Sequence, residues 1–256
     1  MTLSGGKARR EEPFFWWGPG WNPPPRRTLR ELLVAETLDL RTASYLWCAL
    51  YRRCSLAVVA GASGAGKSTL LAALLDFLPA ATTPIHVRGC YETFAFRADP
   101  HVDPNHTALL ANEVSPHLPV YLWGPGVATF LACRRDGYQL LTTAHAANAQ
   151  EFVVMLAGSP LRLAPGQIAA IEFVTALAAP AAKGEAPRVV GLWRMAATQA
   201  GIALDPPPER SNISQEGENG AWFPAEELRA REYALGQLRA GRIEVLPPLP
   251  ILPDGT

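Results

Sequence analysis

The chain has 256 residues, with 23 basic and 23 acidic side chains and therefore a formal net charge of zero. This length suits one α/β domain with short extensions, and the balanced charge gives no field that would recruit nucleic acid or an anionic membrane. The four cysteines show no metal-binding spacing, the first residues lack the apolar core of a signal peptide, and the longest apolar stretch is too short to span a bilayer. We therefore expect a cytoplasmic protein with buried thiols, no membrane span and no nucleic-acid partner.

Residues 1–27 form a leader rich in proline and aromatic side chains, among them Trp16, Trp17 and Trp21. Proline at this density excludes regular secondary structure. Aromatic side chains are unusual in a purely disordered tail. The leader is therefore interpreted either as a segment packed along the domain surface or as an exposed recognition strip.

The first helical signal follows the leader. Thr28 is followed three residues later by Glu31, which is the pattern of a capping box at a helix N-terminus. We predict two short helices, over residues 28–36 and 40–53, before the first strand.

A strand, a glycine-rich loop and a helix come next. The apolar run from Leu56 to Ala60 predicts a buried parallel strand, and leucines at helical spacing continue until Pro79. The loop between them fits G-x-x-x-x-G-K-[ST], the phosphate-binding loop (P-loop) of P-loop NTPases. Its residues are Gly61, Ala62, Ser63, Gly64, Ala65, Gly66, Lys67, Ser68 and Thr69.

Each residue type in this loop has a physical role toward a nucleotide. Glycines allow backbone N–H groups to curl around the phosphates, Lys67 can reach the β- and γ-phosphate oxygens, and the Ser68 hydroxyl can bind Mg²⁺. The helix that follows points its N-terminus at the anion. The motif therefore predicts ATP and Mg²⁺ as cofactors.

The rest of the chain alternates strands and helices and then becomes rich in proline and glycine. This alternation predicts an α/β fold with a mainly parallel sheet covered by helices on both faces. The expected organisation is the leader, a P-loop NTPase domain over residues 28–200, and a Pro/Gly-rich C-terminal extension over 201–256 with one helix. The predicted strands are 85–87, 107–111, 139–143, 168–176 and 188–195, and the predicted helices are 127–135, 147–157 and 225–240.

Three polar residues follow predicted strands and should lie on the nucleotide side of the sheet, because ligands of parallel sheets bind at the carboxyl ends of the strands. Glu113 is placed to bind Mg²⁺ or polarise the attacking water, and Glu92 is a second acidic candidate. His145 could sense or donate to the γ-phosphate. Each also has an ordinary interpretation, as a solvated acid or a structural histidine.

These motifs together resemble the secretion and pilus-assembly ATPases of the type II, type IV and Flp pilus systems. In that family the P-loop is followed by an acidic box ending in glutamate, a strand ending in Gly-Glu, and a histidine box. Here Glu92, the pair Asn112-Glu113, and the segment from Thr143 to Asn148 occupy those places. The resemblance extends over roughly residues 28–195, and the family's separate N-terminal domain has no counterpart in the leader.

The resemblance implies a RecA-like motor domain that hydrolyses ATP. Glu113 and Glu92 would position Mg²⁺ and water, with Glu113 and Ser68 as metal ligands, and His145 would lie near the γ-phosphate. The implied partners are further copies of the chain in a ring, or subunits of a secretion or pilus machinery through which the protein would reach the membrane.

Two other hypotheses remain open. Arg88, Gly89 and Ser115 stand where the family has acids and an arginine, which suggests a nucleotide-binding switch that does not hydrolyse ATP. A third hypothesis is a P-loop kinase acting on a small molecule. For the arginine-bearing lid of such a kinase, Arg134 and Arg135 are the only nearby candidates.

Overall fold

The computed structural model of the protein describes residues 27–180, 182, 184–208 and 221–251. The tryptophans of the leader lie outside these ranges, so neither interpretation of the leader is tested. Within the described residues no helix is both long enough and apolar enough to cross a membrane.

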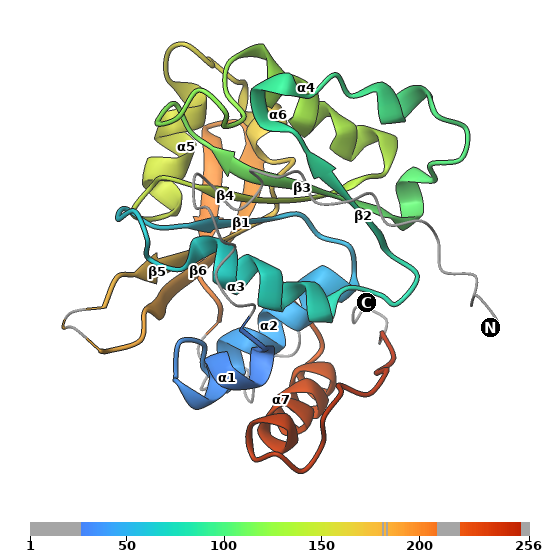
Figure 1. The fold of residues 1–256 in the computed structure, drawn as a ribbon, viewed down its shortest axis with the longest axis vertical. Coiled ribbons are helices and arrows are strands. Elements are labelled where there is room, and N and C mark those ends of the chain that lie inside the picture. Colours follow the sequence, from blue (N-terminus) through green and yellow to red (C-terminus); the bar gives the residue numbers. More distant parts are fainter. Residues whose placement is uncertain (1–26, 181, 183, 209–220, 252–256) are drawn as a thin grey trace.

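A seven-stranded sheet forms the centre of the molecule, in the order β2-β3-β4-β1-β5-β6-β7 (Figure 1). The strands from β2 to β5 in this order are parallel, whereas β6 and β7 are antiparallel to their neighbours. The predicted α/β fold with a mainly parallel sheet is confirmed. The strands are β1 (Leu56–Val59), β2 (Thr83–Val87), β3 (Thr107–Val114), β4 (Gln139–Ala144), β5 (Phe173–Ala178), β6 (Arg188–Thr198) and β7 (Gly201–Asp205).

Helices cover both faces of this sheet, as the alternation predicted (Figure 1). Successive side chains of a strand point to opposite faces, so Leu56 and Val58 of β1 join one core cluster and Ala57 and Val59 join the other. The first face carries α1 (Leu29–Val34), α2 (Leu40–Tyr51), α3 (Lys67–Leu74) and α7 (Ala225–Arg239), and the second carries α4 (Pro125–Ala132), α5 (Ala149–Ala157) and α6 (Pro165–Ile168).

The predicted capping box opens α1. The Glu31 N–H donates to the Thr28 hydroxyl at 3.2 Å, and the Thr28 N–H donates to the Glu31 carboxylate at 2.7 Å. This reciprocal pairing satisfies two backbone donors that a helix start leaves free. The capping-box prediction is therefore confirmed.

The C-terminal helix α7 packs on α2 through a buried group of charges. Arg231 and Glu227 are both almost fully buried, and their side chains lie 3.1 Å apart. Arg52 of the α2 C-terminus pairs with the same carboxylate, and the Arg231 guanidinium lies 5.2 Å from the ring centroid of Trp47. Because a buried carboxylate without a cation is costly, these contacts hold α7 in its position against α2.

The structure differs from the sequence prediction at several elements. The strand predicted over 168–176 begins at Phe173, because α6 occupies the residues up to Ile168. Strand β3 runs three residues beyond its predicted end, to Val114. The edge strand β7 was missed, because it is short and lies next to a proline run. The expectation of buried thiols is wrong for Cys90, which is exposed.

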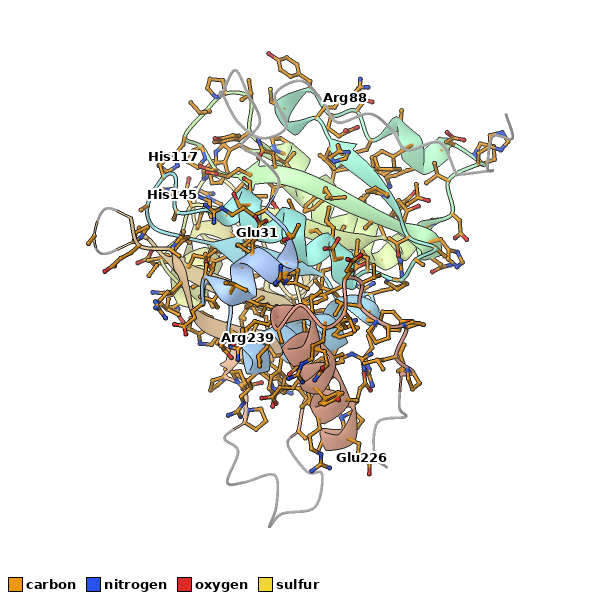
Figure 2. All side chains as sticks on the ribbon, turned by 60° about the horizontal axis from the view of Figure 1, so that its bottom comes forward. Glu31, Arg88, His117, His145, Glu226 and Arg239 are labelled. Carbon is orange, nitrogen blue, oxygen red and sulfur yellow. The ribbon has the colours of Figure 1, made fainter. Side chains whose placement is uncertain are left out.

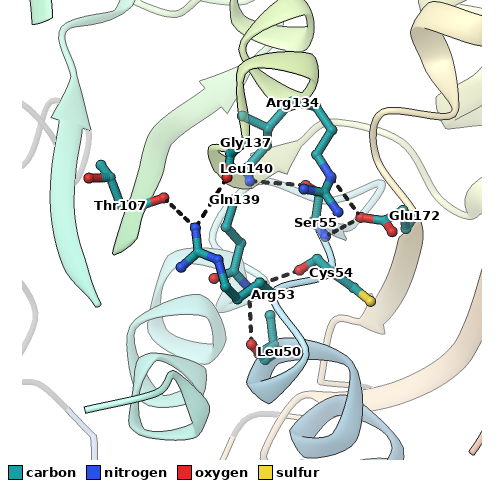
Figure 3. Close-up of polar contacts among 10 residues, drawn as sticks. All are labelled: Leu50, Arg53, Cys54, Ser55, Thr107, Arg134, Gly137, Gln139, Leu140 and Glu172. Atoms are coloured by element: carbon teal, nitrogen blue, oxygen red, sulfur yellow. Dashed lines mark hydrogen bonds and ion pairs between the residues drawn. The ribbon is translucent and has the colours of Figure 1, made fainter. Parts of the chain in front are cut away.

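A polar network ties together the amino ends of the central strands (Figure 3). The Arg134 Nε donates to Glu172 at 3.0 Å, and that carboxylate also accepts the Ser55 N–H at 2.9 Å, just before β1. Arg53 donates to the carbonyls of Thr107 and Gly137, at 3.0 and 3.3 Å. Arg134 therefore lies at the edge of the sheet opposite to the loops that follow the parallel strands.

Candidate functional site

The carboxyl ends of β1, β4 and β3 lie side by side at one edge of the sheet. Val59 of β1 and Val114 of β3 both pair with Ala144 of β4. Lys67 follows β1 after the glycine-rich loop, and His145 follows β4 directly. The order of strands therefore brings these two residues to the same edge as Glu113, near the end of β3.

The glycine-rich loop connects β1 to α3 in the predicted order of strand, loop and helix. Gly66 has a φ of +91° and precedes the first residue of α3, a left-handed conformation that glycine adopts without penalty. A Cβ atom on Gly61 would lie 3.2 Å from the Cβ of Ala147. The start of this loop therefore lies against the segment that carries His145.

Lys67 and Glu113 form a largely buried pair at this edge. The Lys67 Nζ lies 3.6 Å from Glu113 Oε2, and the two side chains are only 7% and 12% exposed. A desolvated ammonium needs a nearby anion, and Glu113 supplies it. The structure therefore unites two residues that the sequence places 46 positions apart.

The backbone around Glu113 is held by the loop that follows β3. The Leu122 N–H donates to the Glu113 carbonyl at 3.0 Å, and Val114 forms a bridge with Leu122. Burial raises the pKa of Tyr121, and the nearby charge of Glu113 raises it further. The backbone of Glu113 is therefore held by this loop.

Two imidazole rings, both labelled in Figure 2, lie against each other with their planes tilted by 54°. The ring centroids of His117 and His145 are 4.1 Å apart. Burial lowers the pKa of His145, and the positive charge of Lys67 and proximity to His117 lower it further. His145 is therefore biased toward its neutral form. The Ser115 hydroxyl lies 2.6 Å from the Nδ1 of His117.

Sequence reasoning missed His117. It follows Glu113 by only four residues, but the predicted strand stopped too early and left this histidine in a proline-marked loop. In the structure, Glu113, His117 and His145 each offer one ligand atom, and these atoms all lie within 4.8 Å of one another. These three side chains could therefore hold a metal ion.

Glu92 has a different set of partners. Its carboxylate accepts the N–H groups of Arg88 at 3.0 Å and of Phe94 at 2.7 Å. Both donors belong to the loop that follows β2, so Glu92 braces the loop on which it sits. Sequence reasoning grouped Glu92 with Glu113, whereas the hydrogen bonds of its carboxylate in the described chain stay within its own loop.

The fold gives a steric reason for the glycine at position 89, where the sequence departs from the pattern that it resembles. Its φ is +58°, and a Cβ atom there would lie 1.8 Å from the carbonyl oxygen of Val120. The β2 loop and the loop that follows β3 therefore meet backbone to backbone at this position. A side chain at this position would require one of the two loops to move.

We expect Gly89→Ala to lower the free energy of unfolding by at least about 2 kcal/mol, because strained backbone and a clash with a carbonyl add together. Gly64→Ala is the matched control, since Gly64 also has a positive φ, +75°, but its Cβ would meet open space. Chemical denaturation without nucleotide measures both variants. Equal losses for the two would show that the close approach at Val120 is unimportant.

Comparison with known proteins finds similarity only among solved structures. No protein-family model and no curated protein matches the sequence. Among solved structures, the chain is similar to the VirB11 ATPase from the Brucella suis type IV secretion system, in complex with sulphate, with 18% identity and a TM-score of 0.45. The match covers 66% of this chain and 63% of that chain, which is less than two thirds of the other protein's length. The proposal of a function therefore rests on the residues of this chain.

Proposed function

We propose that the protein is a RecA-like P-loop NTPase that binds Mg-ATP and hydrolyses it, as an ATPase of the secretion and pilus-assembly type. The observation that carries this proposal is the largely buried pair of Lys67 and Glu113, 3.6 Å apart. One partner belongs to a phosphate-binding sequence and the other ends a neighbouring parallel strand. Buried ion pairs with no nucleotide role also occur, but they are not expected at the end of this loop motif.

The pair gives each residue a role that changes when ATP binds. The phosphate oxygens would draw the Lys67 ammonium away from Glu113, because a phosphate carries more negative charge than one carboxylate. Glu113 would then be available to polarise the attacking water. Ser68 and Glu113 are the residues that would hold Mg²⁺, which supplies charge stabilisation for the transferred phosphoryl group. His145, biased toward the neutral form, would contact the γ-phosphate without adding positive charge.

A second candidate function is nucleotide binding without hydrolysis. It is favoured by the contacts of Glu92, whose carboxylate is already bound by two N–H groups of its own loop. Of the two acidic residues that the sequence suggested, only Glu113 would then be available to act in ATP hydrolysis. In that case ATP would act as a structural switch.

The kinase hypothesis loses its main support. Its lid required arginines above the phosphates, and Arg134 was one of two candidates. Arg134 instead pairs with Glu172 at 3.0 Å at the amino ends of the strands (Figure 3). That edge is opposite to the one where the glycine-rich loop lies. The partners in this proposal are further copies of the chain in a ring, or subunits of a secretion or pilus machinery.

Ser68→Ala tests the nucleotide site through its metal. We expect wild-type protein to bind ATP at least about tenfold more tightly with Mg²⁺ than without it, because Mg²⁺ bridges the phosphates and the Ser68 hydroxyl. Ser68→Ala should lose most of this difference. Ser63→Ala is the matched control, because Ser63 belongs to the same loop and is exposed. Calorimetric titration of the three proteins with ATP, with and without Mg²⁺, gives the six affinities needed.

Two outcomes would contradict the proposal. If wild-type protein does not bind ATP under either condition, both candidate functions fail. If Ser63→Ala and Ser68→Ala lose the Mg²⁺ effect equally, the metal does not bind where the motif predicts.

A further inference from the structure

The two imidazoles and the nearby Glu113 carboxylate form a mixed set of ligands that nucleotide chemistry does not require. Glu113, His117 and His145 offer ligand atoms that all lie within 4.8 Å of one another. Mg²⁺ prefers oxygen ligands and octahedral geometry, so two imidazole nitrogens are unsuitable for it. Zn²⁺ and related transition metals bind two histidines and one glutamate readily, and they leave a fourth position for water.

The surroundings of His117 suit a metal ligand. The Ser115 hydroxyl engages its Nδ1 at 2.6 Å, and Ser115 is itself fully buried. Metal-binding histidines commonly have their second ring nitrogen held in this way, which fixes the tautomer and the orientation of the ring. With Nδ1 engaged by Ser115, Nε2 is the ring nitrogen of His117 that would bind the metal.

The segments that carry the three ligands are also held in place. The His117 N–H donates to the Ser115 hydroxyl at 3.1 Å. Glu113 lies on β3, and its carbonyl accepts the Leu122 N–H at 3.0 Å. His145 directly follows β4, which is paired to β3 through Val114 and Ala144. The site therefore needs little rearrangement of the backbone to close around an ion, which reduces the cost of binding.

We infer that Glu113, His117 and His145 form a binding site for a divalent transition-metal ion of the Zn²⁺ class. Binding itself is independent of the proposed nucleotide function, although two of the ligands are shared with it. A metal bound there would occupy Glu113, so such an ion would restrain hydrolysis. The site is distinct in composition from the Mg²⁺ site of Ser68 and Glu113.

Removal of Lys67 should affect metal binding and ATP binding in opposite directions. Its ammonium lies 3.6 Å from Glu113 Oε2, so it competes with a metal for that carboxylate and repels a cation beside it. Removing Lys67 should therefore tighten metal binding by at least about tenfold, whereas it should weaken ATP binding. No purely structural role of Lys67 predicts both changes together.

The experiment is calorimetric titration of the full chain with ZnCl₂ after removal of metals by a chelator, without nucleotide. All proteins carry Cys90→Ser, because Cys90 is the exposed thiol among the described cysteines and could bind zinc by itself. His117→Ala removes one ligand that the nucleotide proposal does not use. His101→Ala is the matched control, since His101 is exposed and lies outside the group. Circular dichroism verifies that each variant is folded.

We expect one zinc ion per chain, binding at least about a hundredfold more weakly to His117→Ala and unchanged in His101→Ala. Co²⁺ should give an absorption spectrum typical of four-coordinate nitrogen and oxygen ligation, without a thiolate band. Equal zinc affinity of wild-type protein and His117→Ala would overturn the inference, as would weaker zinc binding by Lys67→Ala. Failure of ATP binding alone leaves these zinc results untouched, so the two proposals fail separately.

Discussion

Lys67→Ala should weaken ATP binding by at least about a hundredfold. The Lys67 side chain is only 7% exposed, so its interaction with phosphate would occur in a largely desolvated site. Removing it leaves phosphate charge uncompensated, which typically costs a few kcal/mol. Lys67→Arg should not restore binding, because the planar guanidinium does not replace a compact ammonium at a largely buried position.

Arg239→Ala is the matched control for lost charge. Arg239 is exposed on α7 and lies away from His117 and His145 in Figure 2. Fluorescence anisotropy with a labelled ATP analogue and Mg²⁺ measures all three variants. Equal affinities for Lys67→Ala and Arg239→Ala would remove the glycine-rich loop from nucleotide binding.

Glu113→Gln should lower the rate of ATP hydrolysis by on the order of a hundredfold or more, while ATP affinity is kept or increased. The amide cannot polarise water as a carboxylate does. It also no longer competes for Lys67, which lies 3.6 Å from Glu113 Oε2 in the structure. The rate should therefore fall without a loss of affinity, which separates a defect in chemistry from a defect in folding.

Glu226→Gln is the control for this second variant, because Glu226 is exposed at the start of α7, far from the site in Figure 2. Phosphate release under saturating Mg-ATP gives the rates. Wild-type turnover no greater than that of Glu113→Gln, together with intact ATP binding, would favour the switch that does not hydrolyse ATP.

Much of the fold could be predicted from the sequence because its signals are local. The capping box at Thr28 and the apolar run before the glycine-rich loop each depend on residues close together in the chain. The convergence of Glu113 and His145 followed from one general rule, that parallel strands present their carboxyl ends at one edge. The register of β3, β4 and β1 brings both residues to that edge.

The rest depended on contacts between distant residues. His117 became visible as part of the site only when β3 was seen to continue to Val114 and the loop to fold back at Leu122. Glu92 resembled an acidic-box residue in sequence, but its hydrogen bonds to Arg88 and Phe94 depend on the shape of one loop. Spacing along the chain carries no information about such contacts.

The same limit applies to glycine at position 89. In the sequence it appeared as a departure from a family pattern. In the structure it is required, because the carbonyl of Val120 occupies the space where a side chain would begin. A departure from a motif can therefore reflect the packing of two loops rather than a loss of activity.

The central claim is that Lys67 exchanges Glu113 for nucleotide phosphate, and a crystal structure with Mg²⁺ and a non-hydrolysable ATP analogue tests it most directly. We predict that the Lys67 Nζ contacts the β- and γ-phosphate oxygens, that the ion pair with Glu113 seen at 3.6 Å is broken, and that Mg²⁺ contacts the Ser68 hydroxyl. A nucleotide bound elsewhere, with the Lys67–Glu113 pair unchanged, would contradict the account.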